Sequence, residues 1–186
     1  MNPFSPTDRK TGRLHLGRSS APGARYFVTM VTAHRHPWLT QPASARAVLS
    51  ALQSWHVAGG GRIFAATVMP DHVHVLFELG RTLRLGRCVA RWKAESRRQS
   101  AYAGTWQRDF WEHLVRADES WEDYGLYVFL NPYRAGLVQA GDVWPWWWAP
   151  EPRLFRFAGG LDANGVPPAA WLEDYDARLS KLATGE

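Results

Sequence analysis

Two runs of strand-forming residues, separated only by Pro70 and Asp71, constrain this chain more than any other feature. Residues 62–69 and 72–79 are rich in valine, phenylalanine and other residues that favour strands. Because so short a connection joins neighbouring strands as a hairpin, the two runs are expected to pair antiparallel. The sequence therefore predicts a fold organised around an antiparallel sheet.

The second of these strands carries two histidines on one face. Side chains at positions i and i+2 of a strand point the same way, so His72 and His74 lie side by side, whereas Val73 and Val75 face a core. Two imidazoles can hold one divalent ion, but they do not complete a structural metal site, so such an ion keeps positions open for a substrate. The pair alone is equally compatible with two surface histidines.

Periodicity in the rest of the sequence predicts further strands and helices. The strands are expected at 25–32 and 106–115, and the helices at 43–58, 83–100, 120–131 and 167–182. The helix that follows Ser120 is expected to end near Asn131, because a proline at 132 disfavours helical geometry in the residue before it. The tryptophan-rich run 144–148 suits neither a regular helix nor a central strand. This order predicts an α+β sandwich in which helices cover one face of an antiparallel sheet.

Length and composition favour one domain with two extensions. The chain has 186 residues, of which 46% are hydrophobic, and its single cysteine, Cys88, excludes an internal disulfide. The sequence has neither a membrane-spanning run nor a signal peptide, so we expect a cytoplasmic protein without a membrane partner. We divide it into a basic N-terminal arm (1–24), a catalytic domain (25–149) and a C-terminal tail (150–186).

Positive charge is concentrated in the first 149 residues. The formal charge of the chain is +5, and residues 150–186 hold six acids and four bases, which leaves +7 for residues 1–149. The helix expected at 83–100 has one acid, Glu95, among its bases, an imbalance that favours a surface facing phosphates. The candidate DNA contacts are Arg84, Arg87, Arg91, Lys93, Arg97 and Arg98, with Arg134 further along the chain.

A tyrosine and an asparagine share one face of the helix expected at 120–131. Tyr127 and Asn131 are four residues apart, so they lie one turn from each other. A phenol has a pKa near 10, so attack on a phosphodiester requires activation or a polarised target. Mg²⁺ or Mn²⁺ held by His72, His74 and the amide oxygen of Asn131 would supply that polarisation.

Three segments together resemble the REP-associated tyrosine transposases, a branch of the single-tyrosine HUH (His-hydrophobic-His) transposases. They are residues 69–75 (MPDHVHV), 127–138 (YVFLNPYRAGLV) and 106–113 (WQRDFWEH). The resemblance implies a ferredoxin-like HUH fold and Tyr127 as a nucleophile that forms a 5′-phosphotyrosine on single-stranded DNA. It also implies recognition of DNA hairpins of repetitive extragenic palindromes, by a monomer or a homodimer. The chain departs from the family at 147–148, where two tryptophans replace small polar residues.

Several alternatives remain open from the residues alone. A second His-x-His motif occurs at His34 and His36, and Tyr124 or Tyr133 could replace Tyr127 as the nucleophile. His113 is either a base or a packed residue. Two other functions also fit: a catalytically inactive regulator that binds hairpin DNA, and a metal-dependent hydrolase of small phosphoesters.

Overall fold

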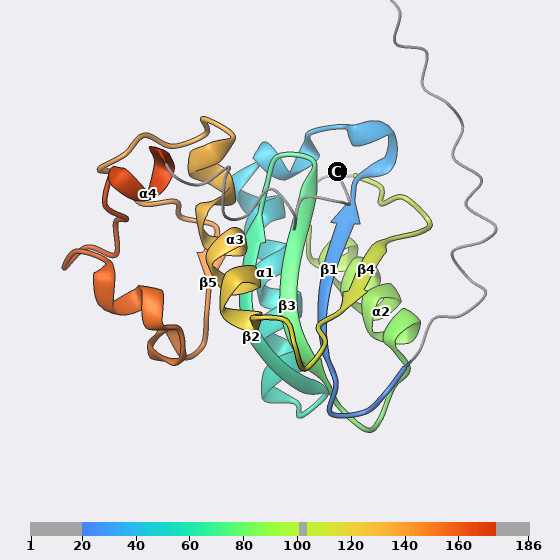
Figure 1. Ribbon diagram of the computed structural model, residues 1–186. Helices are drawn as coiled ribbons and strands as arrows, with labels where there is room; N and C mark the ends of the chain where they lie inside the picture. The colour runs from blue at the N-terminus through green and yellow to red at the C-terminus, as the bar shows by residue number, and fades with distance from the viewer. Residues whose placement is uncertain (1–19, 101–103, 174–186) are drawn as a thin grey trace, which may run out of the picture.

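A five-stranded antiparallel sheet forms the centre of the protein (Figure 1). The structure is a computed structural model, and it describes residues 20–100 and 104–173. The strand order is β4-β1-β3-β2-β5, and β2 and β3 form the predicted hairpin. The strands are β1 (Arg25–Val31), β2 (Gly61–Val68), β3 (His72–Leu79), β4 (Trp111–Leu114) and β5 (Trp147–Trp148).

Helices cover both faces of this sheet, not one as the sequence predicted. In Figure 1, α3 crosses in front of the sheet, whereas α1 and α2 lie behind it. The reason is that β3 is apolar or buried at almost every position, so each face needs its own cover. The helices are α1 (Pro42–Val57), α2 (Leu85–Gln99), α3 (Trp121–Arg134) and α4 (Ala170–Glu173), with short 3₁₀ turns at Ala33–Arg35, Trp38–Thr40, Pro152–Leu154 and Arg156–Gly160.

The two faces carry separate hydrophobic cores. Alternate residues of β3 enter different cores, with Val73 and Val75 on the α1/α2 side and Leu76 on the α3 side. The α1/α2 core also contains Trp55 and Trp92, whose rings meet edge to face at 5.0 Å between centroids. This alternation directs His72 and His74 toward α3, as the period of two predicts.

The end of α3 differs from the sequence expectation. Pro132 lies inside the helix, which continues to Arg134. The stop is a Schellman motif, in which Gly136 (φ 67°) donates its N–H to the Tyr133 carbonyl and Leu137 donates to the Pro132 carbonyl. A glycine that adopts a left-handed conformation, and not the proline, therefore ends α3. Because the helix extends past residue 131, Asn131 lies within its last turns and is held rigidly.

The boundaries of the expected domain also change. Most of the predicted arm lies outside the described residues, but Ser20 accepts a hydrogen bond from the backbone N–H of Leu85 at 3.1 Å. At the other end, Phe155 and Phe157 join the core beneath α3, so no boundary at residue 149 separates a tail from the domain. The short helix expected at 167–182 is observed as α4, and residues after 173 lie outside the described part. None of the helices in that part has the length and apolar character to cross a membrane.

Candidate active site

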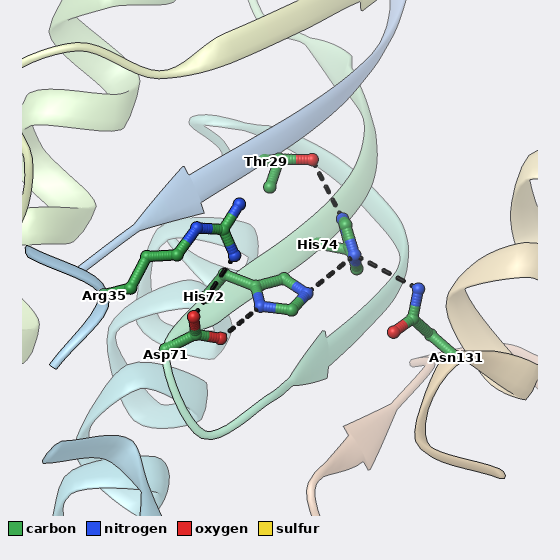
Figure 2. A network of polar contacts seen from close by, with 6 residues as sticks. All are labelled: Thr29, Arg35, Asp71, His72, His74 and Asn131. Atoms are coloured by element: carbon green, nitrogen blue, oxygen red, sulfur yellow. Dashed lines mark hydrogen bonds and ion pairs between the residues drawn. The ribbon is translucent and has the colours of Figure 1, made fainter. Parts of the chain in front are cut away.

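The imidazoles of His72 and His74 meet on the α3 face of the sheet. Their Nε2 atoms are 3.1 Å apart, and the side chains are buried, with 9% and 1% of the residue exposed (Figure 2). Burial of both residues rules out the interpretation of two surface histidines. Neighbouring groups must therefore hold the two imidazole nitrogens within contact distance.

The outer nitrogen of each ring has a partner of its own. Nδ1 of His72 lies 2.6 Å from the Asp71 carboxylate, and Nδ1 of His74 lies 2.9 Å from the Thr29 hydroxyl. A carboxylate only accepts hydrogen bonds, so Nδ1 of His72 carries the proton and its Nε2 presents a lone pair. The hydrogen bond from His72 holds the pKa of Asp71 below its ordinary value, which keeps this carboxylate ionised.

Asn131 completes the group from α3. Its side-chain nitrogen is 3.3 Å from Nε2 of His74, and 3% of the residue is exposed. A half-turn of the amide would present the oxygen instead, since the two amide atoms are nearly equal in shape. Nε2 of His74 therefore lies within 3.3 Å of both the His72 ring, on the same strand, and the Asn131 amide, on α3 (Figure 2).

This donor set fits a divalent ion with six ligands. Adjacent ligands at about 2.1 Å from an octahedral ion are separated by about 3.0 Å, close to the 3.1 Å between the two Nε2 atoms. The Thr29 hydroxyl can either donate to Nδ1 of His74 or accept from it, so Nε2 of His74 either donates to Nε2 of His72 or presents a second lone pair beside it. In the second arrangement a cation between the two Nε2 atoms would relieve the repulsion between the lone pairs. Within the described residues, no group of three or more His, Cys, Asp or Glu could hold a metal. The amide of Asn131 is the neighbouring group that could serve as a third protein ligand.

Tyr127 lies directly against this group. Its ring centroid is 5.3 Å from that of His74 and 5.6 Å from that of Phe27. The i, i+4 spacing on α3 thus brings Tyr127 and Asn131 to the same pair of imidazoles, as the sequence predicts. Only 1% of Tyr127 is exposed, so a DNA phosphate reaches its hydroxyl only after the covering residues move.

The other two candidate tyrosines have different partners. The hydroxyl of Tyr124 donates to Glu119 at 3.3 Å, and burial raises its pKa. The hydroxyl of Tyr133 donates to the Asp142 carbonyl at 2.8 Å. His113 contacts the same Glu119 carboxylate at 2.8 Å and stacks on the Tyr124 ring, which makes it a packed residue of this network.

Sequence reasoning missed the residues that orient the histidines. Asp71 directly precedes His72, and this adjacency was the one available signal. Thr29 reaches His74 only because the two residues are paired in the register of β1 and β3. Arg35 binds the other oxygen of Asp71 at 3.2 Å from a left-handed backbone (φ 51°) in the turn after β1, and no sequence pattern predicts that contact.

Removing an orienting group is expected to weaken metal binding. We expect Asp71→Ala to lower the affinity for Mn²⁺ by about ten- to a hundredfold, because the His72 ring loses the acceptor that fixes its protonated nitrogen. Titration of Mn²⁺ followed by electron paramagnetic resonance measures this change. Thr29→Val, which keeps the shape of the side chain, tests the same effect at His74, and Glu151→Ala is a control on an exposed carboxylate. Unchanged Mn²⁺ affinity in both variants would contradict the assigned role.

The basic residues predicted to contact DNA are divided between two faces of the molecule. Arg134 is exposed at the end of α3, on the side of the histidines. The arginines of α2 and its N-cap lie on the opposite side of the sheet, and they are exposed: Arg84, Arg87, Arg91, Arg97 and Arg98. Arg98 makes an ion pair with Glu95.

Lys93 does not fit its expected role as a DNA contact. It is 8% exposed, and its ammonium donates to the carbonyls of Gln107 at 2.9 Å and Asp109 at 2.8 Å. The helical spacing turns this position inward, beside Trp92 and Val89, so Lys93 fixes the segment before β4 to α2. Lys93 was predicted to contact DNA because the arginines near it in the sequence are basic as well, and charge alone does not show which of these residues faces inward.

Replacement of Lys93 is therefore expected to affect stability. Lys93→Met keeps the length of the side chain but leaves two carbonyls without their donor, and we expect the free energy of unfolding to fall by about 1–3 kcal/mol. Urea denaturation followed by circular dichroism measures the change. Arg87→Met, on the exposed side of α2, should change the stability by less than about 0.5 kcal/mol. Equal stabilities of the two variants would mean that the buried ammonium is dispensable.

Comparisons with known proteins agree with this architecture. The chain is 32% identical over 89 residues to the REP-associated tyrosine transposase of Escherichia coli, covering 45% of this chain and 51% of the relative. A protein of Haemophilus influenzae, provisionally assigned to the same class, is 28% identical over 97 residues, covering 44% and 55% of the two chains. The chain thus spans about half the length of the curated relatives it matches.

A solved structure and a family model complete the comparison. The structure of a REP-associated tyrosine transposase bound to a REP hairpin shares the fold, with a TM-score of 0.59 and 24% identity over 70% of this chain and 79% of that one. The family described as "Transposase IS200 like" matches residues 20–120, which is more than half of the chain and includes both histidines and their orienting residues. The chain belongs to the IS200-like transposase family.

Proposed function

We propose that this protein cleaves and rejoins single-stranded DNA beside hairpins, with Mg²⁺ or Mn²⁺ as its cofactor and Tyr127 as its nucleophile. The observation that carries the proposal is the 3.1 Å approach of two Nε2 atoms whose outer nitrogens are both engaged, next to the Tyr127 ring. The structural relative is described as bound to a REP hairpin, which supports hairpin DNA as the partner.

The chemistry assigned to each residue follows from its position. His72, His74 and Asn131 would hold the ion, which supplies positive charge to a phosphate oxygen and lowers the barrier to attack. The Tyr127 oxygen attacks phosphorus and the phenolic proton leaves to solvent. The bond from phosphorus to the 3′ oxygen breaks, and the 3′ oxygen takes up a proton from solvent. The products are a 5′-phosphotyrosine and a free 3′-hydroxyl.

Rejoining is the reverse of this exchange. A 3′-hydroxyl attacks the phosphotyrosine, a new phosphodiester forms and Tyr127 leaves with a proton. One phosphorus–oxygen bond replaces another in each step, so the reaction needs no nucleotide as an energy source. Both histidines, Asn131 and Tyr127 come from one chain, which supports a single chain as the unit that cleaves; a homodimer would then contain two complete sites.

The test is denaturing electrophoresis of the protein with labelled hairpin oligonucleotides. With Mn²⁺ we expect a covalent protein–DNA band and a shortened oligonucleotide, and with EDTA we expect neither. Release of free phosphate or nucleotide without a covalent band would instead indicate a hydrolase. The burial of Tyr127 favours one other function, a catalytically inactive protein that binds hairpin DNA. That alternative predicts a complex on native gels and no covalent band under any metal condition.

A further inference from the structure

A groove of about 310 Å³ runs between α2 and residues 106–110, on the α2 side of the sheet. Its α2 wall contains Gly86, Ala90 and Ala94, spaced four residues apart on one face, and the buried side chain of Lys93 crosses from α2 to the carbonyls of residues 107 and 109. Arg97 from α2 and Arg108 from the opposite segment also line the groove. Two guanidinium groups from separate elements therefore border a channel with small residues in its wall.

The charge of this groove is positive. Arg97 and Arg108 are exposed, and within residues 20–100 and 104–173 neither has a carboxylate within ion-pair distance. The one acid of α2, Glu95, accepts hydrogen bonds from Arg98 and Gln99, and the hydrogen bond from Arg98 is the main reason its pKa falls to about 2. That carboxylate is thus already neutralised by a neighbour and does not offset the groove arginines.

We propose that this groove binds the sugar–phosphate backbone of the DNA hairpin and anchors it apart from the site of cleavage. That the partner is DNA rests on the proposed function. The position and the positive charge of the binding surface come from the residues that line the groove. Arginine forks suit phosphate oxygens, and small side chains let a backbone approach closely. A membrane surface is flat, whereas a strand of sugar–phosphate backbone can lie within a groove.

The anchor and the histidine pair lie on opposite sides of the sheet. α2 packs on the core that contains Val73 and Val75, whereas Tyr127 packs on the other core (Figure 1). DNA held by the groove must therefore pass an edge of the sheet to reach Tyr127, and β4 is the edge nearest the groove because it directly follows residues 106–110. Loss of the groove arginines should then weaken hairpin binding without changing the chemistry.

The experiment measures binding in EDTA, where no metal-dependent cleavage occurs. The probe is a fluorescein-labelled DNA hairpin with a single-stranded extension, followed by anisotropy over a range of salt concentrations. We expect Arg97→Ala and Arg108→Ala each to weaken binding about fivefold, and the slope of log affinity against log salt to fall by about one. Arg108→Lys keeps the charge and should keep the slope. Arg153→Ala, on an exposed arginine of another surface, should leave both quantities unchanged.

Cleavage at different hairpin concentrations separates this inference from the proposed function. The groove variants should need a higher hairpin concentration for half-maximal formation of the covalent band, and at saturating hairpin they should reach the rate of the unchanged protein. Unchanged hairpin affinity, or equal losses with Arg153→Ala, overturns the anchor. A second outcome that overturns the anchor involves anionic phospholipid vesicles. It is that loss of the two arginines weakens vesicle binding more than it weakens DNA binding. Absence of a covalent band in the unchanged protein, with hairpin affinity still lost in the groove variants, refutes the proposed chemistry and leaves the anchor standing.

Discussion

Tyr127→Phe is expected to abolish the covalent protein–DNA product while hairpin binding survives. The substitution removes one oxygen from a ring that packs against both Phe27 and His74, so the packing and the proposed metal ligands should stay in place. Without the hydroxyl no bond to phosphorus can form, and we expect the yield of the covalent band to fall at least about a thousandfold. Denaturing electrophoresis with Mn²⁺ measures the band, and anisotropy in EDTA measures binding.

Tyr124→Phe is the matched control for this experiment. Tyr124 lies one turn earlier on the same helix and is also buried, but its hydroxyl donates to Glu119 and not toward the histidine pair. We expect this variant to form the covalent band, with some loss of stability because the Glu119 carboxylate loses a donor. A band that persists in Tyr127→Phe and disappears in Tyr124→Phe would transfer the nucleophile to Tyr124.

His72→Ala is expected to have the second-largest effect, through the metal. Removing this imidazole leaves one histidine and one amide, and we expect Mn²⁺ affinity to fall by more than about a hundredfold, since even loss of an orienting partner weakens such sites by ten- to a hundredfold. Cleavage should be lost at Mn²⁺ concentrations that saturate the unchanged protein. Calorimetric titration of Mn²⁺ and the electrophoretic assay give the two readouts.

The second His-x-His motif provides the control for the metal. His36 lies outside the sheet, after the 3₁₀ turn Ala33–Arg35, so His36→Ala should leave Mn²⁺ affinity and cleavage unchanged. Restoration of cleavage in His72→Ala by a large excess of Mn²⁺ agrees with a weakened site. Full cleavage by His72→Ala at ordinary Mn²⁺ concentrations would show that the histidine pair has another role.

The burial of the site has a consequence for the order of events. Both histidines, Asn131 and Tyr127 are each at most 9% exposed, so the arrangement described is closed to a DNA backbone. We expect an ion, which is small, to reach the pair without the displacement of the residues over Tyr127 that a phosphate requires. Under the proposed function, metal binding should then not depend on DNA, and Mn²⁺ titrations of the free protein should measure the site.

Local sequence was sufficient for most elements and for the grouping of the candidate site residues. The alternation of β3 directs His72 and His74 to one face, and the helical period of α3 brings Tyr127 and Asn131 to one side; both follow from backbone geometry alone. The β2–β3 hairpin also follows from the sequence, because two strands joined by a two-residue connection can pair only antiparallel. The resemblance of residues 69–75 and 127–138 to a known family suggested the chemistry that is proposed for them.

Contacts between distant segments required the tertiary structure. The side of the sheet that each helix covers depends on which face remains apolar after the strands pair. The arginines of α2 therefore lie on the side of the sheet opposite the histidines, although the sequence placed both groups in one candidate site. The burial of Lys93 depends on carbonyls of residues 107 and 109, and the role of Thr29 on the register of β1 against β3. Sequence periodicity specifies the direction of a side chain relative to its own helix or strand. Which segment lies opposite that side chain is decided only when the elements pack together.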